Sequence, residues 1–85
     1  MCIDIESITK IINQVTGLNF TPKHKWTHNN GYRFYDDEHF DIYITVDEIE
    51  NIPIFTISQF EQDMELVTAL KLVYPNARIW MTRYA

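Results

Sequence analysis

Residues 39–58 read HFDIYITVDEIENIPIFTIS, and this stretch decides the fold. From Phe40 to Val46 apolar side chains alternate with polar ones, which is the two-residue period of a β-strand with one buried and one solvated face. A second run of β-branched residues, Ile52 to Ile57, follows an acidic connection at 47–51. The stretch predicts a β-hairpin. Because a lone hairpin is only marginally stable in water, the rest of the chain must cover it.

Two amphipathic helices are predicted to cover this hairpin. The first, over residues 4–16, carries isoleucines at helical spacing, and Asp4 is placed to cap its first turn. The second spans residues 59–74, where Ser58 and Glu61 match a capping box. Both helices present an apolar stripe that suits packing against a sheet.

Segment 21–35 has two interpretations. As strands, Lys23–His28 and Tyr32–Tyr35 flank an Asn-Asn-Gly sequence at 29–31, and Asn-Gly is a strong tight-turn signal. As a helix, the segment begins at Thr-Pro and ends at Gly31. We favour the hairpin and keep the short helix as the alternative.

A last strand is predicted over residues 77–84. Its alternation places Ala77, Ile79 and Met81 on one side and Arg78, Trp80, Thr82 and Tyr84 on the other. A strand, a helix and a strand in the final third indicate a crossover connection. The predicted fold is α+β, with one domain over residues 1–85. Its sheet is mixed, mainly antiparallel and of four or five strands, with both helices packed on one face.

Charge is distributed unevenly along the chain. The formal net charge is −5, and ten of the twelve acidic residues lie between Asp36 and Glu65, where no Lys or Arg occurs. Such asymmetry is typical of chains that present one charged surface to a partner. The alternative to a partner-binding surface is an acidic surface that only increases solubility.

The predicted partner-binding residues combine these carboxylates with aromatic side chains expected on the outer sheet face. They are Asp36, Asp37, Glu38, Asp41, Tyr43, Asp47, Glu48, Glu50, Trp80 and Tyr84. Aromatic anchors ringed by carboxylates suit a basic protein. We therefore expect a small acidic binding protein that inhibits or neutralises a basic, nucleic-acid-acting partner such as a nuclease. Immunity proteins, antitoxins and phage anti-defence proteins are analogous in size and charge alone.

A small basic and aromatic edge is also visible. Lys23, Lys25 and Arg33 alternate with aromatic residues, as in surfaces that stack nucleic-acid bases. Because phosphate binding is driven by positive charge and this chain is acidic, we expect no direct nucleic-acid binding. The basic edge is interpreted as a salt-bridging partner of the acidic segment.

Catalysis and metal binding have little support. There is no glycine-rich phosphate loop and no recognisable nucleophile turn. His24 and His28 would share a metal on a helix, but on a strand they lie about 13 Å apart. We expect no catalytic residue, no metal and no other cofactor. The alternatives are a small enzyme or metal-dependent module using His24, His28 or His39, and a homo-oligomeric accessory protein.

No membrane segment is expected. The longest apolar runs fall far short of the roughly 20 residues that span a bilayer. The opening residues also lack the pattern of a signal peptide. The sequence thus predicts a cytoplasmic protein that makes no membrane contact.

Overall fold

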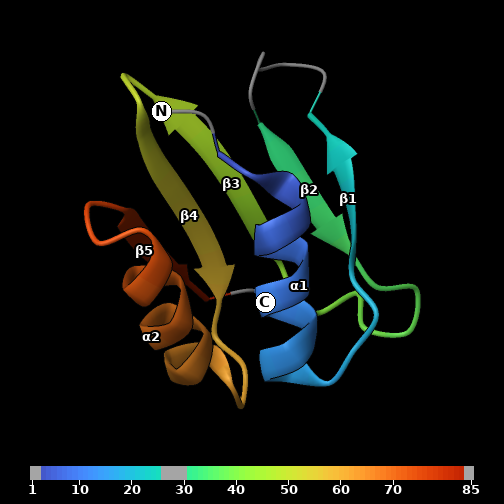
Figure 1. Cartoon of the computed structure of the whole chain (residues 1–85). Coiled ribbons are helices and arrows are strands. Elements are labelled where there is room, and N and C mark those ends of the chain that lie inside the picture. The colour runs from blue at the N-terminus through green and yellow to red at the C-terminus, as the bar shows by residue number, and fades with distance from the viewer. Residues whose placement is uncertain (1–2, 26–30, 84–85) are drawn as a thin grey trace.

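The structure is a computed structural model that describes residues 3–25 and 31–83. Five strands form one sheet in the order β1-β2-β3-β4-β5, in which β4 and β5 are parallel and the other neighbours are antiparallel. Both helices lie on the same face of the sheet (Figure 1). The predicted α+β class is confirmed. In chain order the elements are α1 (Ile5–Thr16), β1 (Thr21–His24), β2 (Tyr32–Tyr35), β3 (Ile44–Ile49), β4 (Ile52–Ser58), α2 (Asp63–Val73) and β5 (Arg78–Thr82).

Helix α1 forms as its sequence predicts. Both carboxylate oxygens of Asp4 accept from Ser7, one from the backbone N–H at 3.4 Å and the other from the hydroxyl at 2.8 Å. The helix ends at Gly17, whose φ of 72° is the left-handed conformation that glycine reaches without strain. Ile8 and Ile12 are fully buried beneath it.

The segment after α1 is a hairpin, not the alternative helix. Strand β1 begins at Thr21, two residues earlier than predicted, and pairs antiparallel with β2. Pairing continues past β1, because the N–H of Lys25 donates to the carbonyl of Gly31 at 2.7 Å. Residues 26–30, with most of the predicted turn and His28, lie outside the described residues.

The central hairpin is present but its boundaries differ from the prediction. Strand β3 begins at Ile44, because residues 36–43 form successive turns in which the N–H of His39 donates to Asp36 O and that of Ile42 to His39 O. Phe40 is therefore 75% exposed and lies outside the strand. At the other end, the expected five-residue connection shrinks to Glu50 and Asn51. Both have positive φ, as a type I′ turn requires.

The predicted capping box of the second helix is wrong. Helix α2 begins at Asp63, and its N-cap residue Gln62 makes no side-chain capping bond. Ser58 is instead the last residue of β4. The alternation predicted for the last strand is confirmed over β5, where Ile79 pairs with Phe55 on the helix-covered face.

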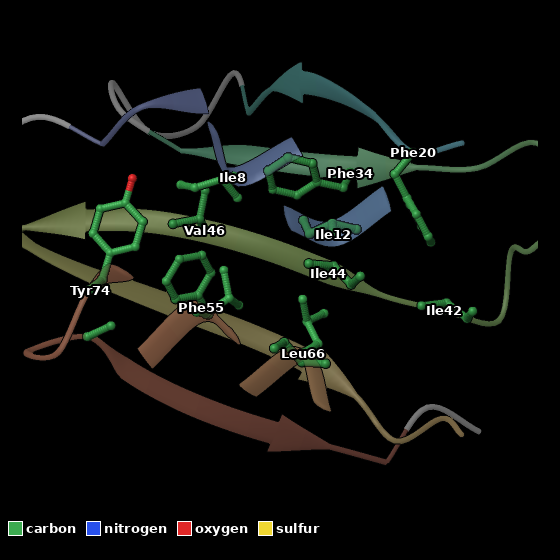
Figure 2. Packing of buried hydrophobic residues seen from close by; sticks show 13 residues of the cluster. Ile8, Ile12, Phe20, Phe34, Ile42, Ile44, Val46, Phe55, Leu66 and Tyr74 are labelled. Atoms are coloured by element: carbon green, nitrogen blue, oxygen red, sulfur yellow. The ribbon is translucent and has the colours of Figure 1, made fainter. Parts of the chain in front are cut away.

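A single apolar cluster joins the helices to one face of the sheet (Figure 2). Cross-strand partners share a face, so the register places Phe34, Ile44, Val46, Phe55 and Ile57 toward the helices. No described helix covers the opposite face, which is called the open face below. The two faces of the sheet therefore meet very different surroundings.

Candidate functional site

Strand direction divides the acidic segment between the two ends of the sheet. Because β2 and β4 end where β3 begins, the loop 36–43 and the segment 59–62 lie at the same end (Figure 1). The β3–β4 turn, with Glu48 and Glu50, lies at the opposite end. We call the first end the acidic end. Its carboxylates are Asp37, Glu38, Asp41, Glu61 and Asp63, and Arg83 follows β5 at the same end.

Asp36 braces the loop at the acidic end. It is 8% exposed, and its carboxylate accepts from the N–H of Asn19 at 2.9 Å and from that of Glu38 at 2.8 Å. The ring Nδ1 of His39 lies 3.2 Å from the same carboxylate. The bond from Asn19, then those from Glu38 and His39, lower the pKa of Asp36 below its ordinary value. Asp36 therefore holds the loop in place, and is not itself available to a partner.

Phe40 is the exposed aromatic side chain of this loop. It lies between His39 and Asp41, while Asp37 and Glu38 occupy the preceding turn. The strand-like alternation of the sequence extends into these turns, and for that reason it predicted that Phe40 is buried in the core. Phe40 is thus a candidate anchor that the sequence did not reveal.

The open face carries the opposite charge. Alternation along the strands places Lys23, Lys25, Arg33 and Arg78 on it, and Asp47 is its sole acidic residue among the described strand positions. Asp47 pairs with Lys25 at 3.2 Å, so its charge is neutralised locally. This is the salt-bridging role expected of the basic edge. The face is positive on a chain whose net charge is −5.

Aromatic side chains hold the cations of the open face. The guanidinium of Arg33 lies 4.8 Å from the ring centroid of Tyr35 and 4.4 Å from that of Tyr43. The ammonium of Lys23 lies 5.2 Å from the same Tyr35 ring. Arg33 Nε is buried without a hydrogen-bond partner among the described residues, so stacking holds this side chain.

The predicted site residues are therefore not gathered on one surface. Tyr43, Asp47 and Trp80 lie on the open face, as expected, but beside cations instead of a ring of carboxylates. Asp37, Glu38 and Asp41 lie at the acidic end, and Glu48 and Glu50 at the far end of the sheet. Tyr84 is outside the described residues.

The histidines do not converge. His24 packs edge-on against Tyr32 with ring centroids 4.9 Å apart, and His39 contacts Asp36. Within residues 3–25 and 31–83, no group of three or more His, Cys, Asp or Glu side chains is arranged to hold a metal ion.

An open groove runs along α1. Its volume is about 670 Å³, and it is lined mainly by apolar atoms. Ile5, Leu18 and Pro22 contribute to its walls, and Glu6 and Lys10 are its charged residues. A smaller pocket of about 130 Å³ lies between Arg33 and Phe40. Neither brings together a set of side chains that would carry out acid–base or nucleophilic chemistry.

In the part of the chain that the structure describes, no helix has the length and apolar character to cross a membrane. Comparison of the chain with protein-family models, with curated proteins and with solved structures gave no match.

Proposed function

We propose that this protein is a non-catalytic binding protein that recognises a basic protein through its acidic end. The observation that supports this most directly is the exposed Phe40, which lies in a loop with Asp37, Glu38 and Asp41. Aromatic side chains supply much of the energy at protein interfaces, and surrounding charges fix orientation and partner choice.

The bracing of the loop by Asp36 also supports this function. The N–H of Asn19 ties the Asp36 carboxylate to the segment between α1 and β1, and the N–H of Glu38 bonds it to the loop's own first turn. A loop already held in one conformation loses less entropy when it binds, which favours affinity. The acidic end is therefore suited to docking as a preformed surface.

The charge of the two surfaces limits how such a partner would approach. Lys23, Arg33 and Arg78 on the open face would repel a basic protein, whereas the acidic end would attract it. The contact is therefore made end-on. Carboxylates in this position would occupy sites where a nuclease or another nucleic-acid-acting protein binds phosphate, so binding would inhibit such a partner. The expected mode of action is that of an immunity, antitoxin or phage anti-defence protein.

Affinity capture with two matched variants tests this proposal. The wild-type chain, the pair Asp37→Lys with Asp41→Lys, and the pair Glu48→Lys with Glu50→Lys serve as baits in a lysate of the source organism. The two variants change the net charge equally but at opposite ends of the sheet. We expect wild type and the Glu48/Glu50 variant to retain a basic protein that the Asp37/Asp41 variant loses. If both variants retained the basic protein equally, or both lost it equally, the acidic end would be excluded as the binding site.

A purified complex allows a second measurement on the same site. Phe40→Ala should weaken binding by at least about 2 kcal/mol if this ring is a central anchor. The association rate should fall as salt concentration rises, because the attraction is between opposite charges. The proposal would be contradicted if Phe40→Ala left the affinity unchanged and salt left the association rate unchanged.

A further inference from the structure

Most of the exposed large apolar side chains belong to the last helix and the last strand. Seven large hydrophobic residues are exposed in the described chain, and five of them belong to α2 or β5. Those five are Met64, Leu72, Val73, Trp80 and Met81. Met81 and the three residues of α2 lie on the helix-covered side of the sheet, and Trp80 lies on the open face.

Strand β5 also has an unpaired edge. It is the last strand of the sheet and pairs only with β4. The N–H of Gln59 donates to the carbonyl of Thr82 at 2.9 Å, so the polar backbone groups of Thr82 face β4. Because these groups alternate in direction along a strand, those of Ile79 and Met81 face outward.

The two edge strands of the sheet differ in how well they are protected against pairing with a further strand. Strand β1, at the opposite edge, contains Pro22, a residue that blocks strand addition. Strand β5 contains no proline, and the side chains that it directs toward the helices, Ile79 and Met81, are uncharged. The β5 edge is therefore open to strand pairing.

We propose that a second copy of this chain pairs with β5, antiparallel and about a two-fold axis at Trp80, to form a continuous ten-stranded sheet. This register pairs all five residues of β5 with those of its copy. Trp80 lies opposite Trp80 of the second copy, and Ile79 lies opposite the second copy's Met81. The outward backbone groups of Ile79 and Met81 then supply the hydrogen bonds of the new pair.

Charge does not oppose a second copy in this register. Arg78 lies opposite the uncharged Thr82 of the second copy, so the arginines of the two strands do not face each other. A two-fold axis makes the contact self-complementary and closed, and no further copy can add at this edge.

The helices extend the same contact. The hydroxyl of Tyr74 lies 3.4 Å from the N–H of Asp4, so this part of α2 faces α1. Leu66 and Leu70 are the buried residues of α2, whereas Leu72 and Val73 at its C-terminal end are exposed. Figure 1 shows α2 over β4 and β5. The two-fold axis therefore places the α2 helices of both copies on the same face of the joined sheet, one on each side of the new strand pair.

This inference is independent of the proposed function. The loop 36–43 connects β2 and β3, in the middle of the sheet, so this loop, with Phe40, stays accessible in both copies. The dimer would present two such loops to its partners.

Sedimentation equilibrium of the purified chain tests the dimer. We expect a mass of twice 10.2 kDa that dissociates on dilution. Met81→Pro removes an outward N–H without touching the ladder to β4, and should raise the dimer dissociation constant about tenfold or more, since two hydrogen bonds are lost per dimer. Ile49→Ala, at an exposed position on β3, is the matched control and should leave this constant unchanged. A monomer at all concentrations would overturn the proposal.

Cysteine cross-linking tests the register and does not depend on how Met81→Pro folds. In a Cys2→Ser background, Trp80→Cys should form an intermolecular disulfide under mild oxidation, because directly opposite residues of this kind have Cα atoms about 4.5 Å apart. Thr82→Cys alone should not cross-link, whereas Arg78→Cys combined with Thr82→Cys should. Cross-linking of Thr82→Cys but not of Trp80→Cys would show a different interface.

Discussion

The hydroxyl oxygen of Ser58 accepts a hydrogen bond from the backbone N–H of Tyr43 at 2.8 Å. The backbone N–H of Ser58 donates in return to the carbonyl of Tyr43, also at 2.8 Å. This reciprocal pair extends the β3–β4 ladder by one residue beyond Ile44. It also fixes the point at which the loop 36–43 joins the sheet.

Replacing Ser58 should therefore destabilise the fold. Ser58 is fully buried, and Ser58→Ala leaves the N–H of Tyr43 without this acceptor, at a cost of about 1–3 kcal/mol. Urea denaturation measures the change. Thr68→Ala, which removes an exposed hydroxyl bonded to Met64 O, is the control and should stay within about 0.5 kcal/mol. Equal losses in the two variants would contradict a special role for Ser58.

Acid should weaken the fold in part through Asp36. Its pKa lies below the ordinary 3.8 because Asn19, Glu38 and His39 hydrogen-bond to the carboxylate. As pH falls below about 4, the unfolded chain takes up a proton that the folded chain still excludes, so stability is lost. Asp36→Asn removes this titration but lowers stability at neutral pH. Denaturation measured from pH 6 to pH 2 gives the free energy of unfolding of both proteins. The difference between wild type and variant should become smaller as pH falls. A difference that stays constant would refute this role.

The two carboxylates Asp41 and Asp47 should respond differently to charge reversal. Asp47 pairs with Lys25, and the two side chains are 21% and 23% exposed. Asp47→Lys places two cations side by side and should cost about 1 kcal/mol. Asp41 is exposed in the turn region, so Asp41→Lys should change stability by less than about 0.5 kcal/mol. Thermal unfolding of both variants in low salt measures the difference, which should shrink in high salt. Identical behaviour would mean that the Lys25 pair contributes nothing.

The stacking of Arg33 should contribute measurable stability. Arg33→Ala removes contacts with both Tyr35 and Tyr43 and should cost about 1–2 kcal/mol. Lys23→Ala removes one contact of an exposed side chain and should cost less than about 0.5 kcal/mol. Chemical denaturation of both variants, together with Tyr43→Leu and the Arg33/Tyr43 double variant, measures the coupling of the pair. An additive double variant would show that the two side chains do not interact.

Local signals in the sequence predicted the elements that depend on neighbouring residues. Helix α1 was foreseen because Asp4 and Gly17 mark its ends. The alternation of β5 was foreseen because its two faces meet different surroundings, the core for Ile79 and solvent for Trp80.

Long-range contacts decided the features that the sequence did not show. Ser58 fits a helix cap by pattern, yet Tyr43, fifteen positions earlier, provides its partner. The alternation at Phe40 resembles a strand, but the bonds of Asp36 turn the chain there instead.

The candidate site was harder to foresee for the same reason. The charge division along the chain is evident from composition, but strand direction decides where each carboxylate lies. Asp41 and Glu50 are close in sequence and lie at opposite ends of the sheet. Only the pairing of all five strands reveals the positive open face.

The parallel pairing of β4 with β5 has a consequence for the order in which the chain assembles. The other paired strands are consecutive in the chain and antiparallel, whereas each residue of β5 pairs with one 24 positions earlier, across the intervening helix α2. Contacts of greater sequence separation form later, since more of the chain must be ordered first. Strand β5 is therefore expected to dock last and to open first. Its amides should exchange with deuterium sooner than those of β3, and a second copy bound along its edge would slow that exchange.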